Sequence, residues 1–228
     1  MARTAIVAAA AFVMLTCMVA RYGATVGGAD RVVSDHARSF ALTHPGWRVF
    51  WSAVTHTADP PVLLCAVAAA VAWLVWRRRY RAAAFTVAAT VSARIVRLGV
   101  LYAVGRPRPA GRLTASAGWA YPSGHTTSAT VTALTVALVA LLVARNATVR
   151  TLVPLVAVAW AVLVGCSRVA LVAHWPTDVV AGWLLGAAAT FLLGWALSGA
   201  PGRPRTARRS GAGSRRSPAV TGRSGAGM

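Results

Sequence analysis

Residues 167–178 read SRVALVAHWPTD, a stretch at the end of a long apolar run that brings Arg168, His174 and Asp178 close together in the sequence. The whole chain has only four acidic residues. The other three lie in a polar connection near the N-terminus: Asp30, Asp35 and Asp59. Asp178 is therefore the one carboxylate expected within the membrane-embedded sequence, where a charge is costly and indicates a functional site.

The composition is that of a membrane protein. Of the 228 residues, 57% are hydrophobic, which is typical of a chain that crosses a bilayer several times and not of a soluble domain. All 24 basic residues are Arg, and the net charge is +20. We interpret this excess as arginine-rich codon usage together with topological signals, because nucleic-acid binding would need a basic face on a folded soluble domain. The cysteines lie in apolar runs without disulfide or metal-ligand spacing: Cys17, Cys65 and Cys166.

Six apolar segments have about the length that crosses a bilayer, which predicts an all-α, polytopic membrane protein with six transmembrane helices. They are residues 4–19, 61–76, 82–104, 126–143, 151–172 and 179–197. The first segment could also be a signal peptide, with Arg3 in front of it and small residues at Gly23-Ala24. We interpret it as a span, because no clean A-x-A cleavage pattern follows.

Arginine-rich segments follow the second, fourth and sixth spans, and they predict the orientation of the chain. They are residues 77–81, residues 145–150 and the tail from Ser198. All three lie on one side if both termini are cytoplasmic, as the positive-inside rule requires. The sequence therefore predicts a membrane domain over residues 1–197 and a disordered, Arg-rich cytoplasmic tail over residues 198–228.

Three connections remain for the opposite, extracytoplasmic side. The first, residues 21–60, contains the aromatic run Pro45-Gly46-Trp47-Arg48-Val49-Phe50-Trp51, which we expect to form a short amphipathic helix along the interface. The second, residues 105–122, is rich in Arg, Pro and Gly. The third, residues 173–177, is very short, and its Pro176 can occupy the first turn of the next helix.

Polar residues beside the second and third connections suit a phosphate group. Ser123 and Gly124 lie where the fourth span begins, and the free N–H groups of a helix N-terminus are a ready anion site. Arg108 and Arg168 can offer planar guanidinium groups that match phosphate oxygens. Further along, Asp178 can accept a hydrogen bond from an imidazole nitrogen of His174, which would fix its tautomer.

Taken singly, these residues have simpler explanations. Ser123 could serve simply as a helix cap, and His125 could be an interfacial polar residue. Arg168 could extend its guanidinium toward the interface, and His174 with Asp178 could be a structural i,i+4 pair. Together these explanations fail, because all the costly polar groups converge on one membrane face.

Three motifs in this order resemble the phosphatidic acid phosphatase type 2 family, whose site is shared with the acid phosphatases and vanadium haloperoxidases. They are Gly105-Arg106-Pro107-Arg108-Pro109, Pro122-Ser123-Gly124-His125, and Ser167-Arg168 through His174 to Asp178. The resemblance covers about residues 1–197. It implies a six-span domain in the plasma (cytoplasmic) membrane with its active site on the extracytoplasmic side.

The resemblance implies a mechanism that the residue chemistry also favours. His174, oriented by Asp178, would attack phosphorus and form a phosphohistidine, while His125 would protonate the leaving oxygen and then activate water. The charge on the phosphate would be stabilised by Arg108, Arg168, Ser123 and the N–H of Gly124. No metal and no cofactor is expected, because the arginines supply the positive charge.

At one position the sequence departs from the family. The family's first motif begins with a Lys seven residues before its Arg, but Leu101 occupies that position and the chain contains no Lys. Arg97 lies one helical turn earlier and is our candidate phosphate-binding replacement, although Arg94 could also reach the site. Arg106 is expected to matter less than Arg108.

The expected substrate is a membrane lipid phosphate or diphosphate, because the site lies at the boundary between bilayer and water. A polyprenyl phosphate or diphosphate of envelope synthesis is our first choice, and we expect no nucleic-acid partner. Two other classes stay open: a lipid phosphotransferase that passes the phosphoryl group from His174 to an alcohol, and a non-catalytic membrane protein of the family.

Overall fold

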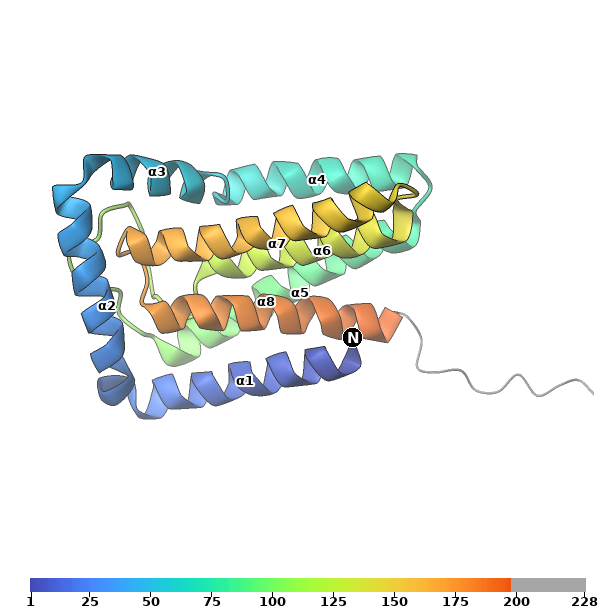
Figure 1. Ribbon diagram of the computed structural model, residues 1–228. Coiled ribbons are helices and arrows are strands. Elements are labelled where there is room, and N and C mark those ends of the chain that lie inside the picture. The colour runs from blue at the N-terminus through green and yellow to red at the C-terminus, as the bar shows by residue number, and fades with distance from the viewer. Residues whose placement is uncertain (198–228) are drawn as a thin grey trace, which may run out of the picture. The chain divides into compact units, whose positions relative to one another are not determined.

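The structure is a computed structural model that describes residues 1–197, except for the side chains of residues 24–26. The tail expected over residues 198–228 lies outside the described residues. Within the described range the chain forms eight α-helices (Figure 1). They are α1 (Ala2–Arg21), α2 (Gly23–Thr43), α3 (Pro45–His56), α4 (Pro60–Trp76), α5 (Tyr80–Val104), α6 (Gly124–Val143), α7 (Ala147–Ala170) and α8 (Pro176–Leu197).

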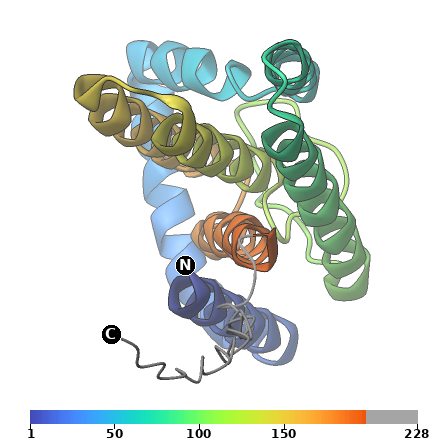
Figure 2. The same ribbon diagram turned by 90° about the vertical axis from the view of Figure 1, so that its right-hand side faces the viewer.

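Six of the helical segments in this range are long and apolar enough to cross a membrane, which confirms the predicted six-span, all-α fold. They correspond to α1, to α3 and α4 taken together, and to α5, α6, α7 and α8. Helix α1 packs along α8, so the first apolar segment is part of the helical assembly. Figures 1 and 2 show α1 and α4 to α8 running roughly side by side.

The long first connection is more ordered than we expected. Helix α2 fills most of it and runs across the ends of the other helices (Figure 1). Helix α3 contains the aromatic run, which confirms that this run forms a short helix. Figure 2 shows α3 crossing the view at an angle to α4, which is seen end-on. That α3 lies along the membrane interface stays a prediction. Val54 of α3 packs against a core cluster that contains Ala161 and Val164 of α7.

Helix α8 lies at the centre of the assembly, in contact with α1, α2, α5, α6 and α7 (Figure 2). Small residues permit its close approach to α6. A Cβ on Gly186 would lie 2.6 Å from Cβ of Thr130, and one on Gly182 would lie 2.8 Å from Cβ of Thr126. Dense packing of this kind fixes the beginning of α8 against the beginning of α6.

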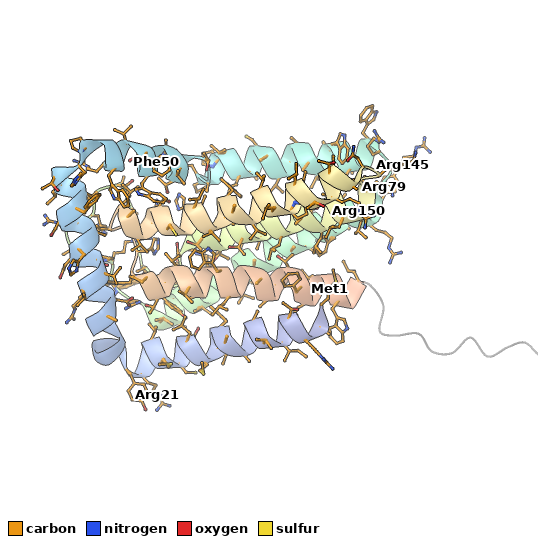
Figure 3. The ribbon with its side chains drawn as sticks, in the orientation of Figure 1. Met1, Arg21, Phe50, Arg79, Arg145 and Arg150 are labelled. Atoms are coloured by element: carbon orange, nitrogen blue, oxygen red, sulfur yellow. The ribbon has the colours of Figure 1, made fainter. Side chains whose placement is uncertain are left out.

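The two arginine-rich connections lie at one end of the helices. Figure 3 shows Arg79, Arg145 and Arg150 at this end together with Met1, whereas Arg21 and Phe50 lie at the other end. The connection between α5 and α6 and the one between α7 and α8 are therefore both at the end opposite to these arginines. This second end carries the motifs that the sequence singled out.

Candidate active site

Two connections meet at this end and hold each other through the backbone. Helix α5 ends at Gly105, whose φ of 56° is left-handed, as at many helix C-termini. The following segment runs to Ser123, where α6 begins. Leu113 N–H donates to the carbonyl of Leu171 (3.0 Å), and Ser123 N–H donates to the carbonyl of Asp178 (3.0 Å). The second and third motifs are thus joined directly.

His174 lies between α7 and α8, and its side chain is buried. Its Nε2 lies 2.8 Å from Nη1 of Arg108. Because a guanidinium has no acceptor, Nε2 must be the unprotonated nitrogen, and a neutral ring carries its proton on Nδ1. Burial, together with the charges of Arg108 and Arg168, holds the pKa of His174 well below its usual value of 6.5. The imidazole is therefore neutral, with a lone pair on Nε2.

Asp178 is buried and lies close to His174, but the expected hydrogen bond is not formed in this structure. Its Oδ2 is 3.5 Å from His174 Nδ1, and that nitrogen has no hydrogen-bond partner among the described residues. Oδ2 instead accepts a hydrogen bond from Trp175 N–H (2.9 Å), and Oδ1 accepts one from Arg106 (2.7 Å). The carboxylate is held in place from two sides beside the imidazole.

Arg106 connects Asp178 to a second buried carboxylate, that of Asp30 in α2. Asp30 accepts from Arg106 Nη2 (2.6 Å), and also from the N–H (3.0 Å) and the hydroxyl (2.6 Å) of Thr177. The sequence alone predicts a polar connection around Asp30 and a lesser role for Arg106. The structure shows that both residues tie α2 to the beginning of α8.

The motif at the beginning of α6 is buried and packed against Arg97. Ser123 makes no side-chain capping bond to α6, and its hydroxyl oxygen accepts from Thr126 Oγ1 (2.9 Å). Arg97 Nε donates to the carbonyl of Pro122 (3.2 Å). A Cβ on Gly124 would lie 2.8 Å from the guanidinium carbon of Arg97, so the absence of a side chain there lets Arg97 approach the motif.

Arg168 is buried at the end of α7. Its Nη1 donates to Thr55 Oγ1 (2.7 Å), and its Nη2 donates to Ser116 Oγ (3.1 Å). Its Nε has no partner among the residues that the structure describes. A buried donor of this kind is costly unless something binds it, and a phosphate oxygen would satisfy it.

Arg108 places its guanidinium directly against the imidazole of His174. Besides His174, its guanidinium donates to the carbonyls of Gly118 (2.9 Å), Ala173 (2.8 Å) and Ala117 (3.1 Å). Burial lowers the pKa of Arg108, although a guanidinium stays protonated at any physiological pH. For Arg108 to bind a phosphate, some of these carbonyl contacts must be exchanged for phosphate oxygens.

His125, in the first turn of α6, is paired with a carboxylate that the sequence reasoning missed. Its Nε2 lies 3.1 Å from Oδ1 of Asp59, whose Oδ2 in turn lies 2.8 Å from Nδ1 of His56. Asp59 stands 66 positions away in the sequence, so no local spacing predicts the pair. A usable signal was the scarcity of acidic residues in a chain of net charge +20, in which each carboxylate can find a cationic or imidazole partner.

The structure thus gathers the predicted site residues at one end of the helices. They are His174, His125, Asp178, Arg108, Arg168, Arg97, Ser123 and Gly124. Arg94, the other candidate for the missing Lys, is exposed on α5. The result is a strongly cationic site around a neutral imidazole, with a helix N-terminus beside it, and such a site suits a phosphate group.

Comparisons with known proteins agree with this fold. A model of the PAP2 superfamily matches residues 84–199, just over half of the chain. Among solved structures, the chain is similar to a transmembrane PAP2 type phosphatidylglycerolphosphate phosphatase from Bacillus subtilis, with 23% identity and a TM-score of 0.74 over 88% of this chain and 99% of that one. It is also similar to Aquifex aeolicus LpxE, with 20% identity and a TM-score of 0.55 over 73% of this chain and 92% of that one. No curated protein matches the sequence significantly. The chain belongs to the PAP2 superfamily.

Proposed function

We propose that this protein is an integral membrane lipid phosphatase that hydrolyses a lipid phosphate or diphosphate through a phosphohistidine at His174. One observation carries the proposal: Arg108 Nη1 lies 2.8 Å from His174 Nε2. A cation able to bind a phosphate therefore lies beside the nitrogen that would attack it. Membership of the PAP2 superfamily supports the same reaction class.

In the first step, the lone pair of His174 Nε2 forms a bond to phosphorus as the bond from phosphorus to the leaving oxygen breaks. His125 gives its proton to that oxygen. In the second step, water attacks the phosphohistidine, His125 takes a proton from the water, and His174 Nε2 leaves phosphorus. Asp178, 3.5 Å from Nδ1, favours the positive charge that the ring of His174 acquires in the intermediate.

Positive charge for the transferred phosphoryl group comes from the protein's own arginines. Arg168 offers a buried Nε without a partner among the described residues, and Arg108 offers the group now on His174. Arg97 adds a third guanidinium next to Gly124. Three preorganised cations suit the charge on the equatorial oxygens, and we infer that the reaction is metal-independent. Activity should then survive EDTA, and orthovanadate should inhibit it.

A lipid substrate follows from where the site lies. It is at one end of a set of membrane-length apolar helices, where a phosphate headgroup can enter while its chains stay in the bilayer. The arginine-rich connections lie at the other end, so the positive-inside rule favours an extracytoplasmic site and cytoplasmic termini. A polyprenyl phosphate or diphosphate remains our preferred substrate. Phosphatidate and phosphatidylglycerophosphate are the other candidate lipid substrates to test.

The test is a panel assay of the purified protein in detergent micelles, with phosphate release measured for each of these lipids. We expect release from at least one lipid, a loss of several orders of magnitude in His174→Ala, and a smaller loss in Asp178→Asn. Addition of a competing alcohol separates hydrolysis from transfer, since a phosphotransferase would form a new phosphate ester. No phosphate release and no ester from any lipid would refute the proposed activity.

A further inference from the structure

The junction between α3 and α4 contacts the site at two places. Thr55 accepts a hydrogen bond from Arg168, and Asp59 lies 3.1 Å from the Nε2 of His125. Asp59 is the N-cap residue of α4, but its side chain makes no capping bond to the described residues of that helix. Its two oxygens instead contact His125 and His56. The carboxylate therefore serves the histidines and not the helix end.

We propose that Asp59 is a positioning residue for His125, and that it fixes the tautomer and balances the charge of the proton-transferring imidazole. This inference rests on the proposed phosphatase activity. A carboxylate can only accept, so the Nε2 of His125 carries the proton of the 3.1 Å contact. Nδ1 is then the nitrogen that exchanges a proton with the leaving oxygen and with water.

The charges around His125 show why such a partner is needed. The groups that face it are Arg168 from α7, Arg108 and His174 from the two connections, and Asp59. Two of these are permanent cations, so a protonated imidazole is repelled unless an anion lies close to it. Asp59 is the anion in direct contact with it among the described residues, which makes the acid form of His125 accessible.

Proton transfer then balances without a net change at Asp59. In the first step, His125 loses its Nδ1 proton to the leaving oxygen, and in the second it takes one proton from water. Asp59 stays ionised throughout and keeps its contact with Nε2–H. His56 holds the other oxygen of Asp59 over 2.8 Å, but its side chain is 65% exposed, so its contribution should be much smaller.

The experiment compares Asp59→Asn with Asp35→Asn, a matched change of an exposed acidic residue on α2. Steady-state phosphate release is measured on phosphatidate and on the best lipid of the panel, in the full-length protein. His125→Gln and the double variant with Asp59→Asn complete a double-mutant cycle. We expect His125→Gln to lower kcat by about 10²–10⁴-fold, the usual contribution of general acid–base catalysis. Asp59→Asn should lower kcat at least about tenfold and leave KM nearly unchanged, whereas Asp35→Asn should match the wild type.

The double-mutant cycle distinguishes a positioning role of Asp59 toward His125 from a purely structural role of Asp59. If Asp59 acts through His125, the double variant should be no slower than His125→Gln alone. Independent, multiplicative losses would show a separate structural role and overturn the inference, as would an Asp59→Asn variant as active as Asp35→Asn. An active wild type with either result refutes only the role of Asp59. A wild type inactive on every lipid refutes the phosphatase activity itself and this role with it.

Discussion

The side chain of Arg97 extends from α5 to the motif at the start of α6, where its Nε donates a hydrogen bond to the carbonyl of Pro122 (3.2 Å). It lies one turn before Leu101, the position at which the family has a Lys. The side chain of Leu101 is buried and cannot supply a charge. The long Arg side chain, attached one turn earlier on the helix, can bring its guanidinium to the same region. The site can therefore keep the same number of cations without the Lys.

Replacing Arg97 by Ala should therefore lower kcat/KM. The decrease should correspond to a loss of about 2–4 kcal/mol in transition-state stabilisation, the range for a lost transition-state donor. Arg94→Ala is the matched control on the same helix, and we expect it to be nearly as active as the wild type because its side chain is exposed. Phosphate release from the best lipid substrate measures both. Equal activity of the two variants would mean that Arg97 only contacts the Pro122 carbonyl.

At the scale of helices, α2 is held to the site by buried charges. Arg106 bridges Asp30 of α2 and Asp178 of α8, and the carboxylates are 1% and 0% exposed. Truncation of one partner leaves a buried charge uncompensated, which costs about 3–5 kcal/mol. These contacts lead us to expect a severe effect of Arg106→Ala, although the sequence alone favours a milder effect than that of Arg108→Ala.

Arg106→Ala should lower the melting temperature in detergent and abolish most activity, because two carboxylates lose their cation. Adding Asp30→Asn should recover part of the melting temperature, since it removes one of the two unpaired charges. Arg112→Ala, an exposed position in the same connection, should melt with the wild type. A double variant no more stable than Arg106→Ala would argue against this ion-pair network.

The contact between α6 and α8 sets the distance between the second and third motifs. A Cβ on Gly182 would lie 2.8 Å from Cβ of Thr126 and 3.1 Å from the carbonyl of Ser123, so α6 would have to move. We expect Gly182→Ala to destabilise the protein by about 1–3 kcal/mol and to lower activity. Gly194→Ala on the same helix is the control, because its nearest neighbours lie 3.9 Å away. Thermal unfolding in detergent and lipid phosphatase activity are the measurements, and equal behaviour of the two variants would contradict the close packing.

For the whole molecule, the arrangement of the arginines predicts which end faces the cytoplasm. In a background with the natural cysteines replaced by Ala, new cysteines at Ala115 or Ala117 should react with an impermeant thiol reagent in intact cells. Both positions are exposed in the connection that carries the first motif. Cysteines at Arg79 or Arg145, at the opposite end, should react only after the membrane is opened. The reverse labelling pattern would place the site on the cytoplasmic side.

The spans could be predicted from the sequence because hydropathy is local, and so could the grouping of His174 with Asp178, which depends on a spacing of four residues. The positions of the three motifs beside connections on one side of the membrane also predicted that Arg108, Ser123 and Arg168 lie at the same end of the helices. The pairing of His125 with Asp59 could not be predicted, because it depends on how α3 packs against α7 and α4 against α6. The same holds for Arg106 and Asp30, which are 76 positions apart. Helix α2 was missed because its polar composition reads as a connection when its tertiary partners are unknown.

The central claim is that His174 becomes covalently phosphorylated during turnover. The direct measurement is mass spectrometry of the full-length protein after brief incubation with the best lipid substrate and a quench at alkaline pH, which preserves phosphohistidine. His125→Gln should accumulate the intermediate if loss of the general base slows its hydrolysis more than loss of the general acid slows its formation. We predict a phosphoryl group on His174 in the wild type or in His125→Gln, and none in His174→Ala. Lipid hydrolysis that proceeds without phosphorylation of His174 in either protein, or that persists in His174→Ala, would contradict the proposed mechanism.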